Sequence, residues 1–171
     1  MKHGMAQRVD HMVRQLVPAS LVLFLVLMQA MPWHLPALAG IFPALPMIGL
    51  YYWSVYRPDL LVPSVAFATG LVNDVVLGGP IGVSSLAFLF IQGMTASQTR
   101  FFNGKSFLVI WSGFALLAAG ALLVELVMSS LVFGRTPVFS ALVIQCALTV
   151  CLYPPVSWLF SRLQLFWLRN E

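Results

Sequence analysis

The sequence predicts an all-α membrane protein, folded as a compact bundle of six transmembrane helices. Of its 171 residues, 60% are hydrophobic and only 8% are charged, whereas soluble domains carry about 25% charged residues. The mean hydropathy is +0.93, and apolar runs recur at about the 20-residue length that crosses a bilayer. We expect one polytopic domain, 1–171, because no stretch is long and polar enough to form a second, soluble one.

The first predicted span covers residues 16–32 and follows a basic N-terminal segment, 1–15, with Lys2, Arg8 and Arg14. A basic start before an apolar run is also typical of a signal peptide, and Ala37-Leu38-Ala39 fits a cleavage site. However, the apolar run is long for a signal peptide, and further hydrophobic spans follow it. We therefore expect an uncleaved first helix.

The second predicted span, residues 38–56, is interrupted by Pro43 and Pro46. Each proline removes a backbone hydrogen-bond donor that a neighbouring element must replace. A bundle of five spans with one re-entrant segment is therefore the alternative to six spans.

Four further spans complete the predicted bundle: residues 60–77, 81–96, 107–133 and 138–160. Short connections force sequential neighbours to pack antiparallel. The chain ends in a basic and aromatic tail, 161–171, which contains Arg162, Trp167 and Arg169. We expect this tail either to lie in the headgroup zone as an interfacial helix or to end the last span as an aromatic belt with basic anchors.

The basic residues predict the orientation, because cytoplasmic loops carry an excess of Lys and Arg. With six spans and a cytoplasmic N-terminus, eight of the nine basic residues lie in cytoplasmic segments and Arg135 lies outside. Without the second span, Arg57, Arg100 and Lys105 would face outward, and the bias would weaken. We therefore predict a multi-pass protein with both termini in the cytoplasm.

Several classes of function are disfavoured. The basic residues are too few and too scattered for a nucleic-acid-binding patch. The sequence contains no P-loop, no nucleophile motif and no metal-ligand spacing, so we expect no catalytic residue, no metal site and no cofactor. Cys146 and Cys151 would point about 140° apart on one helix and are not expected to form a disulfide.

Two carboxylates, Asp74 and Glu125, lie inside predicted spans, where a charge costs roughly 2.5–3.5 kcal/mol at the bilayer centre. Helical rise puts them about 22 and 27 Å from the inner ends of their spans, so both are expected in the outer half of the membrane. Asn73 and Gln145 lie at a similar depth, and one hypothesis is a shared polar cavity that opens outward. The alternatives are that each acid is hydrated near the headgroups or caps a neighbouring helix.

Two connections carry turn residues. Arg57-Pro58-Asp59 at the inner boundary is interpreted as a turn and topology anchor, and the alternatives are an ion pair or a dock for a cytoplasmic partner. A surface ion pair contributes only about 0–1 kcal/mol. Gly78 and Gly82 lie on either side of Pro80. They predict a tight turn, because glycine tolerates the positive φ angles that such turns require.

Small residues four positions apart mark faces where helices can approach closely. The third span carries two such pairs, Ala66 with Gly70 and Ser64 with Ala68. We favour packing within the bundle over an intermolecular seam.

Three of these features occur in one order along the chain: a proline-containing second span that ends in Arg57-Pro58, then Gly70-x-x-x-Asp74, then the turn from Gly78 to Gly82. In this order, from Phe42 to Ser85, the chain resembles the MreD family of bacterial rod shape-determining membrane proteins. Elsewhere the resemblance rests on length, span count and a basic N-terminus, and it assigns no role to Glu125.

The resemblance implies a non-enzymatic component of the cell-elongation machinery in the bacterial inner membrane. Such a protein would bind the membrane helix of MreC and help to organise peptidoglycan synthesis. Its further partners, direct or indirect, would be MreB and a peptidoglycan glycosyltransferase–transpeptidase pair. The residues implied for partner binding or for the structure of the motif are Arg57, Pro58, Gly70, Asp74, Gly78, Pro80 and Gly82.

The resemblance also implies a fold similar to the substrate-binding subunits of energy-coupling-factor transporters. Likeness of fold does not by itself imply transport. A small-molecule binding or transport subunit of the vitamin-transporter type is nevertheless the alternative function. Its outward cavity would be lined by Asn73, Asp74, Glu125 and Gln145.

Overall fold

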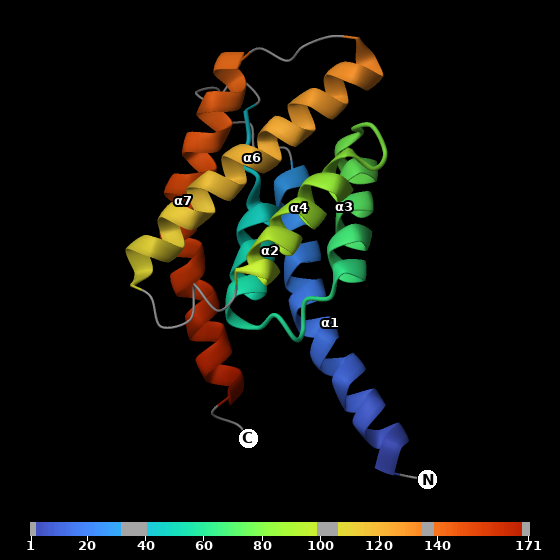
Figure 1. The fold of residues 1–171 in the computed structure, drawn as a ribbon. Helices are drawn as coiled ribbons and strands as arrows, with labels where there is room; N and C mark the ends of the chain where they lie inside the picture. Colours follow the sequence, from blue (N-terminus) through green and yellow to red (C-terminus); the bar gives the residue numbers. More distant parts are fainter. Residues whose placement is uncertain (1–2, 32–40, 99–105, 135–138, 169–171) are drawn as a thin grey trace.

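The computed structural model of the chain describes residues 3–31, 41–98, 106–134 and 139–168. All regular structure in these residues is helical, which confirms the all-α class (Figure 1). The helices are α1 (His3–Ala30), α2 (Leu45–Tyr56), α3 (Pro63–Leu77), α4 (Val83–Ser97), α6 (Phe107–Phe133) and α7 (Phe139–Leu168).

The helix boundaries agree best with the prediction at α6, which coincides with the predicted fifth span. α3 begins at Pro63 rather than at residue 60, because proline is favoured in the first turn of a helix. α7 continues without a break from the predicted sixth span through the tail to Leu168. The backbone of the tail is therefore the end of the last helix rather than a separate interfacial helix.

The second predicted span differs from the structure. α2 has only 12 residues and begins at Leu45, with Pro46 in its first turn. Residues 41–44 are not helical, and the backbone N–H of Ala44 donates to Thr149 Oγ1 of α7 at 2.9 Å. The predicted span over residues 38–56 is thus not helical at residues 41–44, where the predicted interruption lies, and a side chain from another helix satisfies the backbone N–H of Ala44.

α2 forms the centre of the bundle. It packs against α1, α4, α6 and α7, and every residue from Pro46 to Val55 is buried. A helix that is apolar all round is buried on all sides. An aromatic cluster joins it to its neighbours: Tyr51 of α2 lies 5.2 Å from the ring of Phe114 in α6 and 5.7 Å from that of Tyr153 in α7.

α7 contains Pro154 and Pro155 within its length. Pro154 has no N–H to donate to the carbonyl of Val150, one turn earlier. The indole Nε1–H of Trp111 in α6 donates to that carbonyl instead, at 3.0 Å. A neighbouring helix thus replaces the lost hydrogen bond, which is how prolines are tolerated in apolar helices.

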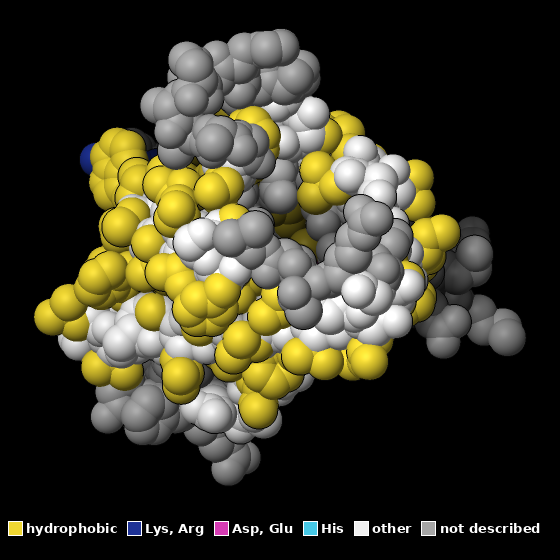
Figure 2. Space-filling view, turned by 90° about the horizontal axis from the view of Figure 1, so that it is seen from above, with side chains coloured by type: hydrophobic (Ala, Val, Ile, Leu, Met, Phe, Trp, Pro, Cys, Tyr) yellow, Lys and Arg dark blue, Asp and Glu magenta, His cyan; other side chains and the backbone are white. Residues whose placement is uncertain are grey.

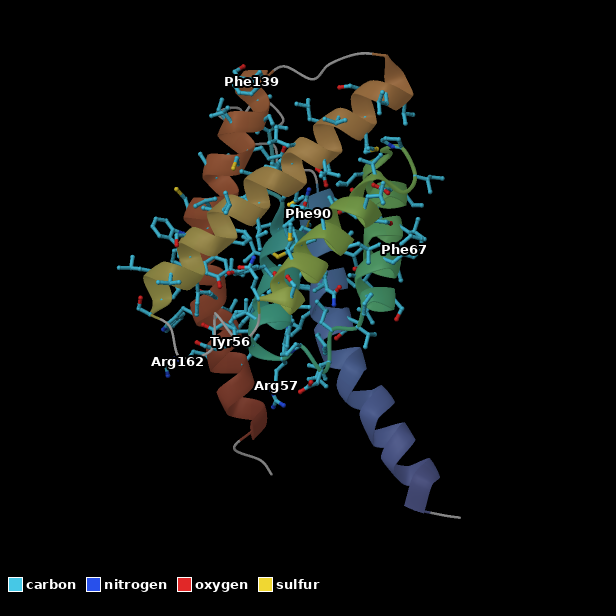
Figure 3. All side chains as sticks on the ribbon, viewed as in Figure 1. Tyr56, Arg57, Phe67, Phe90, Phe139 and Arg162 are labelled. Atoms are coloured by element: carbon cyan, nitrogen blue, oxygen red, sulfur yellow. The ribbon has the colours of Figure 1, made fainter. Side chains whose placement is uncertain are left out.

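α3 and α4 form an antiparallel hairpin, and α4 packs against α6, which crosses the bundle obliquely (Figure 1). The turn of this hairpin lies at one end of the molecule, here called the hairpin end. α1 begins and α7 ends at the opposite end, here called the terminal end (Figure 1). Figure 3 shows Arg57 and Arg162 toward this terminal end.

The surface is largely apolar, and hydrophobic side chains dominate the described part of the face seen from above (Figure 2). Among the described residues, two segments are long and apolar enough to cross a membrane, Phe107–Val132 and Phe139–Leu163. The apolar part of α1, Val17–Ala30, is shorter, as are α3 and α4. The number of spans therefore stays a prediction.

Candidate functional site

Asp74 lies in the last turn of α3 and is only 3% exposed. Its Oδ2 accepts the backbone N–H of Gly82 at 2.7 Å, and its Oδ1 accepts the backbone N–H of Ser84 at 3.1 Å. These N–H groups at the start of α4 have no partner within their own helix, and the helix dipole there favours a negative charge. Asp74 therefore caps the neighbouring helix.

Two glycines turn the chain back so that Asp74 can reach α4. Gly78 ends α3 with a φ of 69°, and Gly82 precedes α4 with a φ of 98°. Side chains other than glycine rarely tolerate this left-handed region. The N–H of Gly79 closes the end of α3 by donating to the backbone carbonyl of Asp74 at 2.9 Å, and the carbonyl of Pro80 accepts the N–H of Val83 at 3.3 Å.

Gly70 allows α3 and α4 to approach closely. A Cβ at this position would lie 2.4 Å from the Cα of Ser85, closer than real side chains come to a backbone. Ala66, one turn earlier, is fully buried. The face formed by Ala66 and Gly70 thus packs within the bundle, whereas Ser64 and Ala68 are exposed.

Asn73 and Glu125 bring further polar groups to the start of α4. Asn73 is 5% exposed; its Nδ2 donates to Ser84 Oγ at 3.0 Å, and its Oδ1 is buried without a hydrogen-bond partner. Glu125 lies on α6, which packs against α4, and it is half-buried. No described residue donates a hydrogen bond to the Glu125 carboxylate.

Gln145 is not joined to this group. It lies on α7, which packs mainly against α2 and α6. Its backbone carbonyl accepts the hydroxyl of Thr149 at 2.7 Å, and within the described chain no contact links its side chain to Asp74 or Glu125. Of the four residues of the hypothetical polar cavity, the structure thus joins Asn73 and Asp74, both through Ser84.

Arg57 and Pro58 lie at the other end of α3. The N–H of Leu60 donates to the carbonyl of Arg57 at 3.1 Å, which closes a turn. In the segment described as 41–98, Arg57 and Asp59 form no ion pair with each other. Of the seven motif residues, two therefore lie in this turn and five in the α3–α4 hairpin, and their role in binding a partner stays a prediction.

Ser84 is the residue of the site that sequence reasoning missed. Its backbone N–H binds Asp74, and its hydroxyl accepts from Asn73, so it holds two adjacent residues of α3. A serine two residues after Gly82, in the first turn of a helix, was the available signal.

The family model described as "rod shape-determining protein MreD" matches residues 10–163, which include every residue of the site. No curated protein and no solved structure matches the chain. The implied similarity to the substrate-binding subunits of energy-coupling-factor transporters therefore stays a prediction.

Proposed function

Because the chain belongs to the family of the rod shape-determining protein MreD, we propose that it is a non-enzymatic component of the cell-elongation machinery in the bacterial inner membrane. The observation that carries this proposal is the extent of the family match, which covers residues 10–163. Family membership and the two long apolar helices together indicate a membrane protein.

We infer that all six helices lie in the membrane as a multi-pass bundle, with both termini in the cytoplasm. The supporting observation is that α1 begins and α7 ends at the end that also carries Arg57 and Arg162 (Figures 1 and 3). The positive-inside rule favours the cytoplasm for such an end. α6 is about 40 Å long, whereas α3 and α4, at about 22 Å each, would cross only with their connecting turns or in a locally thinned bilayer.

We propose further that the protein binds the membrane helix of MreC and so helps to organise peptidoglycan synthesis, with MreB and the glycosyltransferase–transpeptidase pair as direct or indirect partners. Short connections, residues 57–62 and 78–82, support contact through the sides of helices. The outer side of α3 is a suitable surface, because Phe67, Val72 and Val75 are exposed on it. The Asp74 cap holds that helix firmly against α4.

The test combines depletion with co-purification. Rod-shaped cells depleted of the protein are expected to become round, and the full-length protein in mild detergent is expected to retain MreC in equal stoichiometry. Depleted cells that stay rod-shaped and still assemble MreC would contradict the proposal. Purified protein that carries a bound metabolite and no single-span partner would instead favour a small-molecule binding or transport subunit.

A further inference from the structure

The α3–α4 hairpin is shorter than the apolar layer of a membrane. Each of its two helices has 15 residues and is therefore about 22 Å long, whereas the hydrocarbon core is about 30 Å thick. The last turn of α4 lies near the headgroups, because α4 ends at Ser97 and the sequence continues with polar residues up to Arg100. The turn between the two helices then lies about 8 Å short of the opposite membrane surface. In agreement, α6 and α7 extend beyond this turn at the hairpin end (Figure 1).

The hairpin carries no residue at its tip that anchors a chain at a membrane surface. Trp, Tyr, Lys and Arg are the usual anchors, and the sequence from residue 75 to residue 99 contains none of them and no Asp, Glu or His. α1 and α6 also end at the hairpin end (Figure 1). In the sequence, Trp33 and His34 follow α1, and Arg135 follows α6. The hairpin tip thus differs from the two other connections that begin at this end.

The exposed side chains at the tip are apolar. Val76, Leu77 and Ile81 are 38%, 44% and 76% exposed. Apolar surface in water costs about 25 cal/mol per Å² relative to an apolar environment. Lipid acyl chains remove this cost, whereas a tip that reaches the water does not.

The turn pairs most of its backbone N–H groups within the hairpin. The backbone carbonyl of Asp74 accepts the N–H groups of Gly78 and Gly79. The carboxylate of Asp74 accepts those of Gly82 and Ser84. One buried residue thus closes both the end of α3 and the start of α4 without water. Irregular backbone is tolerated inside a bilayer only where protein groups satisfy it, because hydrocarbon offers no hydrogen-bond partner.

We propose that α3 and α4 form a re-entrant hairpin, whose tip ends within the hydrocarbon and contacts lipid acyl chains instead of water. A re-entrant hairpin returns the chain to the side from which it entered, as two full spans do, so both termini stay on the same side. The inference rests on the proposed function, which places the bundle in the membrane. It also restricts the partner, because only a membrane-embedded segment can contact the turn from Gly78 to Gly82.

The test compares cysteine labelling at two positions of the full-length protein in lipid nanodiscs. Ile81 at the hairpin tip and Phe139 at the start of α7 (Figure 3) are 76% and 68% exposed, so a difference in rate reports the bilayer rather than the fold. Ile81→Cys and Phe139→Cys are made in a background of Cys146→Ala and Cys151→Ala, because both native cysteines are free. A charged maleimide reaches both faces of a nanodisc, so the rates do not depend on orientation or on MreC.

In dioleoyl phosphatidylcholine, Ile81→Cys should react at least about tenfold more slowly than Phe139→Cys, because hydrocarbon excludes the charged reagent and keeps the thiol protonated. In thinner dilauroyl phosphatidylcholine, the rate at Ile81→Cys should rise toward that at Phe139→Cys. Labelling of the unfolded proteins gives the total thiol to which each rate is normalised.

Equal rates at the two positions in dioleoyl phosphatidylcholine overturn the inference, as does a rate at Ile81→Cys that stays the same in the thinner bilayer. Absence of MreC binding contradicts the proposed function instead, and it leaves these labelling rates unchanged. The two failures are therefore distinguishable.

Discussion

At the scale of single residues, Asp74 shows how this bundle keeps a charge inside an apolar helix. A carboxylate costs roughly 2.5–3.5 kcal/mol at the bilayer centre, whereas each hydrogen bond to a charged group contributes about 1.5–3 kcal/mol. The two N–H groups of Gly82 and Ser84 are therefore sufficient to offset the cost. A cationic partner is not required for Asp74.

Substitutions of Asp74 should separate hydrogen bonding from charge. Asp74→Asn keeps one acceptor and turns an amide donor toward the second N–H, so we expect a loss of about 1–2 kcal/mol in the free energy of unfolding. Asp74→Leu leaves both N–H groups unpaired, and the expected loss is about 3 kcal/mol or more. Chemical unfolding in detergent micelles measures both.

The matched control is Asp59→Asn, because Asp59 is exposed in the turn between α2 and α3. This change should stay within about 0.5 kcal/mol of the wild type. An Asp74→Asn protein as stable as Asp59→Asn would show that the Asp74 cap contributes little to folding.

Alanine substitutions at Gly70 and Gly93 should change the stability of the protein in opposite directions. A Cβ at Gly70 meets the Ser85 backbone at 2.4 Å, whereas a Cβ at Gly93 meets nothing within 4 Å. Alanine gains about 1 kcal/mol over glycine within a helix, so Gly93→Ala should raise the stability by up to that amount. Gly70→Ala should lower it, because a backbone cannot move aside as a flexible side chain can. Unfolding curves of the two variants that shift in the same direction would refute the close approach at Gly70.

At the scale of elements, α6 and α7 are joined by a hydrogen bond that exists because of a proline. Trp111→Phe removes the donor to Val150 and leaves a part-buried carbonyl unpaired, at an expected cost of about 1–3 kcal/mol. In a Pro154→Ala background, the new N–H at residue 154 can bond to Val150 within α7. The same Trp111→Phe change should then cost at least about 1 kcal/mol less, as a double-mutant cycle measures.

Trp158→Phe serves as the control for this cycle. Trp158 is also on α7, but it is 60% exposed, and its ring contacts Arg162 rather than a backbone carbonyl. Its cost should be the same in the wild-type background and in the Pro154→Ala background. Equal costs of Trp111→Phe in the two backgrounds would mean that Trp111 does not compensate for the proline.

α3 is anchored at both of its ends. At the terminal end, Gln92 Nε2 of α4 donates to the Leu61 carbonyl just before α3, at 3.3 Å. At the hairpin end, the Asp74 cap joins α3 to α4. These contacts join α3 to α4 at both ends of the hairpin, and Phe67, Val72 and Val75 are exposed on its outer side.

At the scale of the whole molecule, the places of the aromatic core and of the described arginines bear on the orientation in the membrane. Tyr51 and Tyr153 form part of the aromatic core of α2, α6 and α7, and Arg57 and Arg162 lie toward the terminal end (Figure 3). The carboxylates Asp74 and Glu125 lie toward the hairpin end. The position of Arg57 and Arg162 supports the proposed orientation in the membrane, because the positive-inside rule counts Lys and Arg.

The sequence by itself determined the helical class, the MreD family and the boundaries of α6. Composition indicates a membrane protein. A long apolar run without proline or glycine interruptions forms a helix, because backbone groups in hydrocarbon must be paired within the helix. The turn glycines at positions 78 and 82 were also predictable, because only a few residues tolerate positive φ.

Only the tertiary structure decided where the broken elements and the polar groups find their partners. The start of α2 depends on Thr149, about one hundred residues away, and the proline in α7 depends on Trp111. Asp74 accepts two backbone N–H groups of α4, whereas no described residue donates to the Glu125 carboxylate, although both are acids in apolar helices. The physical reason is that a hydrogen bond requires a donor within about 3 Å, and the donors here come from other helices whose positions local sequence does not specify.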